Sequence, residues 1–530
     1  MFLLNRLRRA SRGISRPSMR LFASFPSQAD APMPSGATKG IVVGIYEHPE
    51  KDYVFTECGE EVDGKLRGRL KNEIERCGLK GKSGEVKVLN GLSGDFYSVA
   101  IVGLGTKEVG FSVPESLDMG LENVRVAAAL GALKLRDDCV AEISLDPMGH
   151  PEEVAEGATL ALWEYQDNRR VEDRQRAVAL ECYNCLDEDA WTRGLFKAEA
   201  QNLARKLAEA PANQLTPTIF AQVATDSLCP CGVTLDVRGA DWIAAQRMTA
   251  FMAVARSSCE PPALLEVNYA GSEPGERPIV LVGSGITFNS GGLCLKSLPE
   301  MEYERATMSG AAVVMAAVRA AAALSLPINI RALIPLCENM PSGMSFKVGD
   351  VFRCSNGKSV AVHDTGNAET LIMADAFAYA MQIYKPRLVM DLATMTRKGN
   401  LLGSTASSVF TNSDAMWKEL QKAGAITGDR VWRFPLWKTY TRQISNFTNY
   451  DLSNRGDGQA YTCRKAAFLK EFIGDSEWIH MDIGEAGLVS PHNFVPYYRQ
   501  GKMTGRPTRA LIQFLYQLAC PEQITDLREM

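Results

Sequence analysis

Two stretches of this chain combine polar residues with glycines in patterns that could form a catalytic or binding site. Residues 282–296 read VGSGITFNSGGLCLK and residues 362–376 read VHDTGNAETLIMADA. The first stretch is not expected to bind phosphate, because no Gly-Lys-Ser/Thr follows its glycines. The glycines predict tight backbone turns instead, since glycine reaches positive φ without steric cost.

The charged side chain at the end of the first stretch is Lys296. Together with Arg397 it could form an anion-binding site. Alternatively, Lys296 pairs with a local acid such as Asp364 or Glu369. His363 lies in the second stretch as a lone histidine, and a structural role is favoured over a ligand role.

Both stretches resemble signature motifs of the leucyl aminopeptidase family, which read VGKGITFDSGG…K and NTDAEGRL…ADA. Further similar segments are APANQLTPT (210–218), LPINIRALIPLCENMPSG (326–343), VFTNSD (409–414), TGDRVWRFPL (427–436) and GKMTGRPTRALIQFL (501–515). The resemblance covers most of residues 205–515. It implies a two-domain α/β fold, with a smaller N-terminal α/β domain and a larger C-terminal α/β domain that has a mixed central sheet.

The resemblance also implies a reaction that uses two zinc or manganese ions, roughly 3.5–4 Å apart. In the family, four carboxylates and one neutral lysine amine bind these ions. The five matching positions here hold Ser284, Asn289, Thr307, Gly366 and Ala368. The family's electrophilic lysine matches Lys296, and Thr370 replaces the arginine that holds a bicarbonate.

None of the five positions offers an anionic oxygen, which hard divalent cations need to offset their dehydration. The sequence therefore predicts no metal cofactor. Lys296 and Thr370 are then remnants of the catalytic positions, and the former site is expected to be a neutral-to-cationic pocket.

An alternative register of the second stretch must be considered. Sliding the motif by one residue would bring Asn367 and Glu369 near ligand positions. Val362 before the motif and Leu371 after it fit the family without a gap, which favours the original register.

The pocket wall also departs from the family. Residues 394–397 read TMTR where the family has TLTG, so Met395 and Arg397 are expected at the wall of the specificity pocket. The Arg397 guanidinium would either fill the cavity or turn outward to solvent or to a neighbouring subunit.

The N-terminal residues differ in composition from the rest of the chain. The first 29 contain six arginines, and the first acid is Asp30. This pattern resembles a mitochondrial transit peptide over residues 1–30, with a disordered basic tail as the alternative. Without these arginines the chain has 52 basic and 62 acidic residues, which disfavours nucleic-acid binding.

The remaining chain is predicted to form an N-terminal domain over 35–185, a linker helix over 186–209 and a C-terminal domain over 210–525. Strands are expected at 41–46, 98–105, 279–285, 328–336 and 387–394. They alternate with helices such as 196–209 and 309–324, an order typical of α/β domains. The apolar run 311–324 is shorter than a membrane span and contains Arg319; it predicts a buried helix.

These features favour a catalytically inactive relative of the leucyl aminopeptidases, located in the mitochondrial matrix. The combination resembles insect sperm leucyl aminopeptidases, which implies a structural role in the mitochondrial derivative of sperm. Alternatives are an active metal-dependent leucyl aminopeptidase and an inactive subunit that co-assembles with active relatives. The family implies a homo- or hetero-hexamer. The Cys182-x-x-Cys185 pair matches no zinc spacing. A redox role is disfavoured, because such a pair is expected at a helix start after a strand and this segment resembles a loop that enters a helix, so its role is left open.

Overall fold

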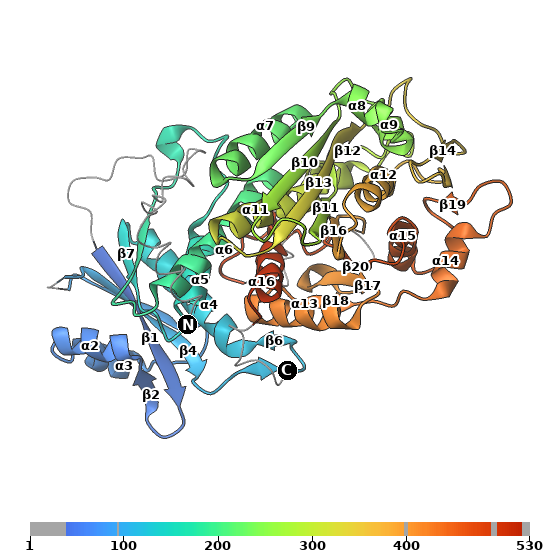
Figure 1. The fold of residues 1–530 in the computed structure, drawn as a ribbon. Coiled ribbons are helices and arrows are strands. Elements are labelled where there is room, and N and C mark those ends of the chain that lie inside the picture. Colours follow the sequence, from blue (N-terminus) through green and yellow to red (C-terminus); the bar gives the residue numbers. More distant parts are fainter. Residues whose placement is uncertain (1–38, 93–94, 397–400, 489–494, 522–530) are drawn as a thin grey trace.

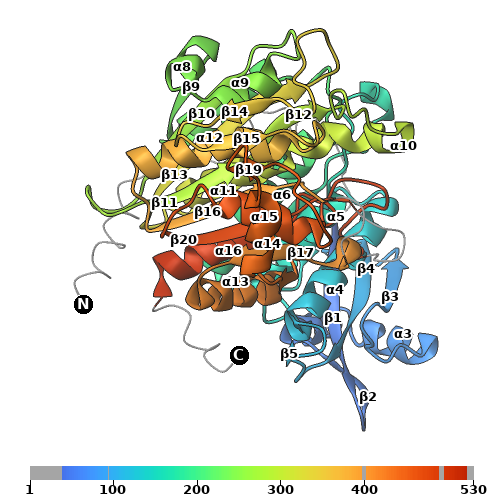
Figure 2. The same ribbon diagram turned by 90° about the vertical axis from the view of Figure 1, so that its right-hand side faces the viewer.

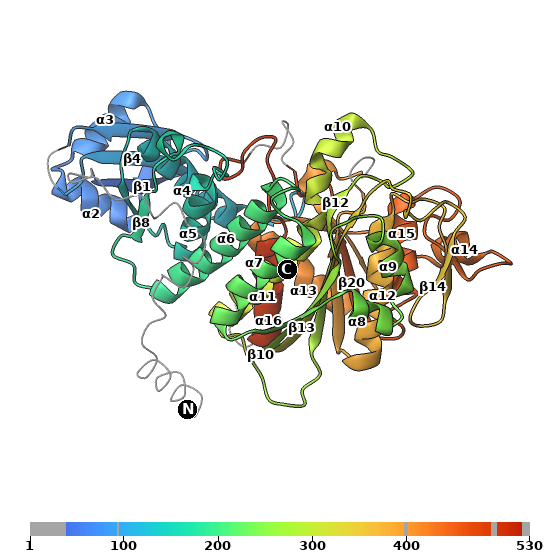
Figure 3. The same ribbon diagram turned by 90° about the horizontal axis from the view of Figure 1, so that it is seen from above.

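The computed structural model describes the chain except for residues 1–38, 93–94, 397–400, 489–494 and 522–530. The predicted transit peptide and Arg397 lie outside the described residues. The described chain forms two α/β domains joined by the long helix α6 (Glu188–Glu209), which runs between them in Figure 3. The predicted fold class is confirmed.

The N-terminal domain is built on a six-stranded sheet in the order β3-β4-β1-β7-β8, with β2 paired to β1. Its strands are β1 (Lys39–His48), β2 (Asp52–Phe55), β3 (Val86–Asn90), β4 (Ser98–Thr106), β7 (Glu142–Leu145) and β8 (Ala179–Cys182). A separate two-stranded hairpin consists of β5 (Phe111–Ser112) and β6 (Leu117–Asp118).

Helices cover both faces of this sheet. One face packs against α4 (Met119–Asp137) and α5 (Pro151–Leu162), and the other against α2 (Glu57–Lys65) and α3 (Arg69–Cys77). The central strands β1 and β4 are almost continuously apolar and buried, as expected for parallel strands covered on two faces.

The C-terminal domain has a nine-stranded mixed sheet in the order β18-β17-β20-β16-β11-β13-β10-β9, with β12 paired to β13. The strands are β9 (Thr234–Arg238), β10 (Ala263–Ala270), β11 (Ile279–Gly283), β12 (Gly285–Asn289), β13 (Asn329–Asn339), β16 (Leu388–Ala393), β17 (Ser407–Thr411), β18 (Val431–Arg433) and β20 (Glu477–Asp482). The central strands β13, β11, β16 and β20 are parallel.

Two helical layers sandwich this sheet (Figure 3). One contains α6, α7 (Pro217–Leu228), α11 (Ser309–Ala323), α13 (Asp414–Thr427) and α16 (Thr508–Ala519). The other contains α8 (Ala240–Ala245), α9 (Thr249–Ala255), α12 (Ala368–Ile383), α14 (Lys438–Ser445) and α15 (Tyr461–Lys470). A small sheet of β14 (Val351–Arg353), β15 (Ser359–Ala361) and β19 (Leu452–Ser453) packs on α9 and α14 (Figure 2).

The predicted apolar helix 309–324 corresponds to α11 and is buried in the core. With α10 (Leu298–Met301) and the 3-10 segment Glu302–Met308 it forms the helical stretch Leu298–Ala323, whose length and hydropathy would suffice for a membrane span. However, 89% of its apolar window is buried inside the protein. It is therefore the core helix that the sequence predicts.

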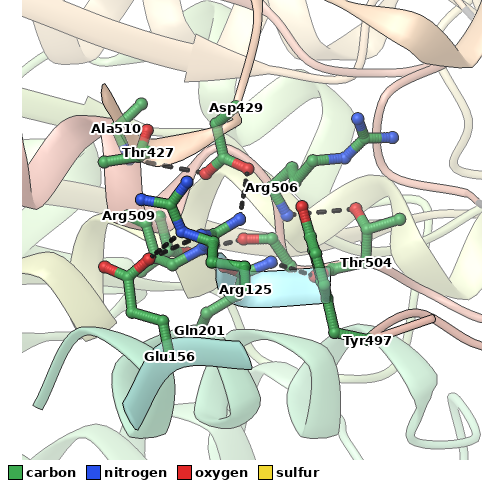
Figure 4. A network of polar contacts seen from close by, with 12 residues as sticks. Arg125, Glu156, Gln201, Thr427, Asp429, Tyr497, Thr504, Arg506, Arg509 and Ala510 are labelled. Carbon is green, nitrogen blue, oxygen red and sulfur yellow. Dashed lines mark hydrogen bonds and ion pairs between the residues drawn. The ribbon is translucent and has the colours of Figure 1, made fainter. Parts of the chain in front are cut away.

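A buried network of charges joins the two domains (Figure 4). Arg125 of α4 donates from Nε to Glu156 Oε2 at 2.7 Å, and Arg509 of α16 donates from Nη1 to the same oxygen at 2.8 Å. Arg509 also donates to Asp429 Oδ1 at 3.1 Å and to Gln201 Oε1 at 2.6 Å. The Glu156 carboxylate of the N-terminal domain is thus shared by guanidiniums from both domains.

Candidate functional site

A cavity of about 980 Å³ lies beside the ends of β12 and β16. It brings together both sequence stretches. Its lining includes Asn289, Lys296, Thr307, Gly366, Thr370 and Met395, all singled out from the sequence. It also includes Glu304, Glu369, Tyr461 and Lys465, of which only Glu369 was considered from sequence.

Close backbone approaches hold the site together. A Cβ on Gly310, at the start of α11, would lie 2.1 Å from Leu392 O, and one on Gly283, at the end of β11, would lie 2.7 Å from Ala311 Cα. Gly291 and Gly292 follow β12 with φ values of 92° and 64°. The predicted tight turns are therefore present, and they place Asn289 and Lys296 at the cavity.

Asn289 connects the two stretches through its side-chain amide. Its Nδ2 donates to Gly366 O at 3.2 Å, and its Oδ1 accepts from Gly291 N at 3.1 Å and from Asn339 Nδ2 at 2.8 Å. The side chain is 1% exposed. An aspartate here could not donate to Gly366 O, so this geometry suits the neutral amide.

Lys296 is paired with an acid that the sequence reasoning missed. Its Nζ lies 2.7 Å from Glu304 Oε2, and Thr307 Oγ1 donates to the same carboxylate oxygen at 2.8 Å. Glu304 is 3% exposed. The expectation of a local acid partner is correct, but the choice of Asp364 or Glu369 is wrong, because the helical segment after Lys296 folds Glu304 back over the lysine.

The side chains of residues 364–370 offer few groups that could bind a ligand. Gly366 has no side chain, and Ala368 is the first residue of α12 and fully buried. Thr370 Oγ1 donates to Asn367 O at 2.7 Å, and Asp364 Oδ1 accepts from Gly366 N at 2.8 Å. The Thr370 hydroxyl is thus directed to its own helix.

Glu369 and Lys465 place two buried opposite charges at the cavity wall. Glu369 Oε1 accepts from the Thr394 amide and hydroxyl, both at 3.1 Å. Burial raises the pKa of Glu369, against the opposing effects of Thr394 and the Ser284 hydroxyl. Burial lowers the pKa of Lys465, which donates to Met395 O and lies 4.3 Å from the Tyr461 ring centroid.

His363 has a structural role in the described site. Its Nε2 is 3.1 Å from Tyr450 OH and its Nδ1 is 2.9 Å from Ser453 Oγ. Both ring nitrogens are therefore engaged by hydroxyl groups of the loop around β19, as the structural interpretation of this histidine expects.

The described lining of the cavity carries more acids than lysines, whereas the sequence suggested a neutral-to-cationic pocket. Among the described lining residues, two lysines face five acids: Lys296 and Lys465 against Glu300, Glu304, Asp364, Glu369 and Glu485. The expectation did not count these acids, and it also placed Arg397 at the pocket wall; because Arg397 lies outside the described residues, the charge of the whole pocket stays a prediction. Most of these acids come from neighbouring positions that the motifs do not include.

The residues present do not fit a pair of divalent cations. Of the five positions that the resemblance marks as metal ligands, Ser284, Asn289 and Thr307 offer neutral oxygens, whereas Gly366 and Ala368 offer no side-chain donor. Within the described residues, no group of three or more His, Cys, Asp or Glu side chains is arranged to hold a metal ion. Two acids of the cavity instead contact protein groups, Glu304 with Lys296 and Glu369 with Thr394.

Comparisons with known proteins identify the family. The catalytic-domain model of the cytosol aminopeptidase family matches residues 202–512, and its N-terminal-domain model matches residues 42–172. The cytosol aminopeptidase of Bos taurus is 43% identical over 507 residues, covering 94% of this chain and 95% of that protein. The cytosol aminopeptidase of Homo sapiens is 44% identical, covering 91% and 93%.

A solved structure agrees with this assignment. The bottromycin maturation enzyme BotP in complex with Mn has a TM-score of 0.77 and 28% identity, over 91% of this chain and all of that one. The similarity spans both domains and both sequence stretches. This chain belongs to the cytosol aminopeptidase family.

Proposed function

We propose that this chain is a catalytically inactive member of the cytosol aminopeptidase family, which binds no metal pair at the family position. The observation that carries the proposal is the Asn289 side chain. Its amide hydrogen-bonds to Gly366 O, Gly291 N and Asn339 Nδ2, so a position that the family uses for a metal carboxylate serves here to join two loops.

The neighbouring charges support this proposal. Lys296 engages Glu304, and the described site supplies no carboxylate at any of the five ligand positions. Without two metals, one lysine would have to supply the several kcal/mol of charge stabilisation that peptide hydrolysis needs. The four lost carboxylates would also repel one another in a metal-free site.

We further propose a structural role in the mitochondrial matrix. The arginine-rich, acid-free N-terminal residues support import, and the resemblance to insect sperm leucyl aminopeptidases supports a scaffolding role in the sperm mitochondrial derivative. A hexamer, formed alone or with active relatives, is consistent with the retained family fold.

A second candidate is a metal-dependent leucyl aminopeptidase that releases N-terminal residues from peptides. The comparisons by themselves favour it, because relatives 43–44% identical over nearly the whole chain are cytosol aminopeptidases. The side chains at the five expected ligand positions argue against this candidate, because none of them is a carboxylate or an amine. The two candidates differ in metal content and turnover, so one experiment separates them.

The purified chain lacking residues 1–22 is expected to carry no stoichiometric zinc or manganese and to leave leucine anilide uncleaved. Elemental analysis and the anilide assay, with added Zn²⁺ or Mn²⁺, measure this, and light scattering on the same sample reports the assembly. A cytosol aminopeptidase from Bos taurus is the positive control. Two bound metals per subunit, or turnover that a chelator abolishes, would establish the second candidate instead.

Fusing residues 1–35 to a fluorescent protein should direct it to mitochondria, because the segment is basic and free of acid before Asp30. Fluorescence microscopy and the size of the processed product measure import and cleavage. A fusion with all six arginines replaced by glutamine is the matched control. Diffuse cytosolic fluorescence of the unaltered fusion would contradict the mitochondrial proposal.

A further inference from the structure

The Cys182-x-x-Cys185 pair lies outside the cavity, on the N-terminal domain. Cys182 is the last residue of β8, an edge strand of the sheet. Tyr183 and Asn184 form a turn, with Asn184 at φ 46°. Cys185 follows, shortly before α6 begins at Glu188. The two cysteines therefore occupy the first and fourth positions of a tight turn.

This placement brings the two thiols together. The first and fourth Cα atoms of a β-turn lie within about 7 Å, close to the range of about 4.4–6.8 Å that a disulfide requires. Both side chains pack against the same apolar cluster of the N-terminal domain. The turn and this shared packing therefore place the two thiols near one another.

The surrounding contacts hold the turn in place. Tyr183 OH and Asn184 Nδ2 both donate to Glu61 Oε1 or Oε2 of α2, at 3.0 Å, and Tyr183 N donates to Leu145 O at 2.8 Å. Cys185 Sγ donates to Asp187 O at 3.4 Å, and Asp187 in turn caps α6 by accepting from Ala190 N. A preorganised turn favours closure of a bridge because little chain entropy is lost.

The two thiols differ in their environments. Burial raises the pKa of the Cys182 thiol, and its coupling to Cys185 adds to the rise. Both thiols are half-buried, but Cys182 lies at the end of β8 and Cys185 in the loop beyond it. Because the thiolate is the nucleophile in disulfide exchange, Cys185 is suited to react first and Cys182 to react second.

We propose that Cys182 and Cys185 form a reversible dithiol–disulfide site whose oxidant is a small disulfide of the glutathione class. The Cys185 thiolate attacks one sulfur of the oxidant, and the other half leaves as a thiol after taking up a proton. Cys182 then loses its proton and attacks the Cys185 sulfur, releasing the second thiol. Two protein thiols are oxidised to one disulfide, and one small disulfide is reduced to two thiols.

The test uses the full-length protein, incubated with oxidised and reduced glutathione at set ratios and then quenched by alkylation. Peptide mass spectrometry should show loss of both free thiols at Cys182 and Cys185 and an internal bridge, reversed by excess reduced glutathione. The matched internal control is Cys229 and Cys231, also close in sequence, the first exposed and the second half-buried; they should stay largely alkylated at ratios that oxidise the first pair.

Single variants separate the two roles. Cys182→Ser should stop at a stable mixed disulfide on Cys185, whereas Cys185→Ser should remain at least tenfold less reactive than the unaltered chain. Alkylation of both residues under strongly oxidising ratios would overturn the proposal. A bridge from Cys182 to the nearby Cys58, or equal oxidation of Cys229 and Cys231, would overturn it as well.

Discussion

Replacing Glu156 with glutamine should lower the free energy of unfolding by about 3–5 kcal/mol. The change keeps the shape of the side chain but removes the charge that Arg125 and Arg509 share at 2.7 and 2.8 Å. Both guanidiniums are fully buried, so neither can recover its lost partner from water. Denaturant-induced unfolding followed by circular dichroism measures the effect.

The matched control is Glu115→Gln, which breaks an exposed ion pair with Arg430 at 2.6 Å. Exposed pairs contribute about 1 kcal/mol or less, so this variant should unfold close to the unaltered chain. A loss below about 1 kcal/mol for Glu156→Gln would mean that the interdomain network does not depend on this carboxylate.

The same residue predicts a dependence of stability on pH. Burial alone raises the pKa of Glu156, but Arg125 and Arg509 outweigh it and hold the pKa at about 2, below its ordinary value of 4.5. Its stabilisation is therefore complete above about pH 4.5 and is lost as the pH falls toward 2. The difference between the unaltered chain and Glu156→Gln should shrink over this range.

Asn289→Asp should destabilise the chain by about 1–3 kcal/mol and confer neither metal binding nor peptidase activity. The carboxylate would lose the hydrogen bond to Gly366 O and face that carbonyl at close range, now 3.2 Å from the amide nitrogen. A two-metal site needs its whole ligand set, so one restored acid is not enough. Denaturation, elemental analysis and the leucine anilide assay measure the three effects.

Asn356→Asp is the control for this substitution, because Asn356 is exposed and only accepts a hydrogen bond, from Lys358 N. It should leave stability nearly unchanged. Metal-dependent activity from Asn289→Asp alone would show that other groups already bind metal, and that the second stretch was matched in the wrong register. Metal uptake is otherwise expected only when all five ligand positions are restored together with Thr370→Arg. The five changes are Ser284→Lys, Asn289→Asp, Thr307→Asp, Gly366→Asp and Ala368→Glu.

The fold was predictable because its signals are local. Apolar runs at 41–46 and 279–285 match buried strands, and the glycines at 291 and 292 do adopt positive φ. The site was predictable only in part. Glu304 and Lys465 lie at the cavity because a helical turn and a distant helix carry them there, and no motif marks them.

The interdomain network was missed for the same reason. Arg125, Glu156 and Arg509 are far apart in the sequence, and each by itself looks like an ordinary surface charge of an amphipathic helix. Their pairing depends on how two domains meet, which neither helical periodicity nor composition encodes. Contacts of this kind become visible only in three dimensions.

Gly283 and Gly310 have a consequence for how such chains are classified. Any side chain at either position would collide with backbone atoms of the neighbouring element, so packing alone requires glycine at both, whatever becomes of the chemistry beside them. A sequence pattern that depends on these glycines therefore identifies chains with this fold, whether or not they are active. To distinguish active peptidases from proteins that retain only the fold, a sequence pattern must include positions whose residue type is not fixed by packing.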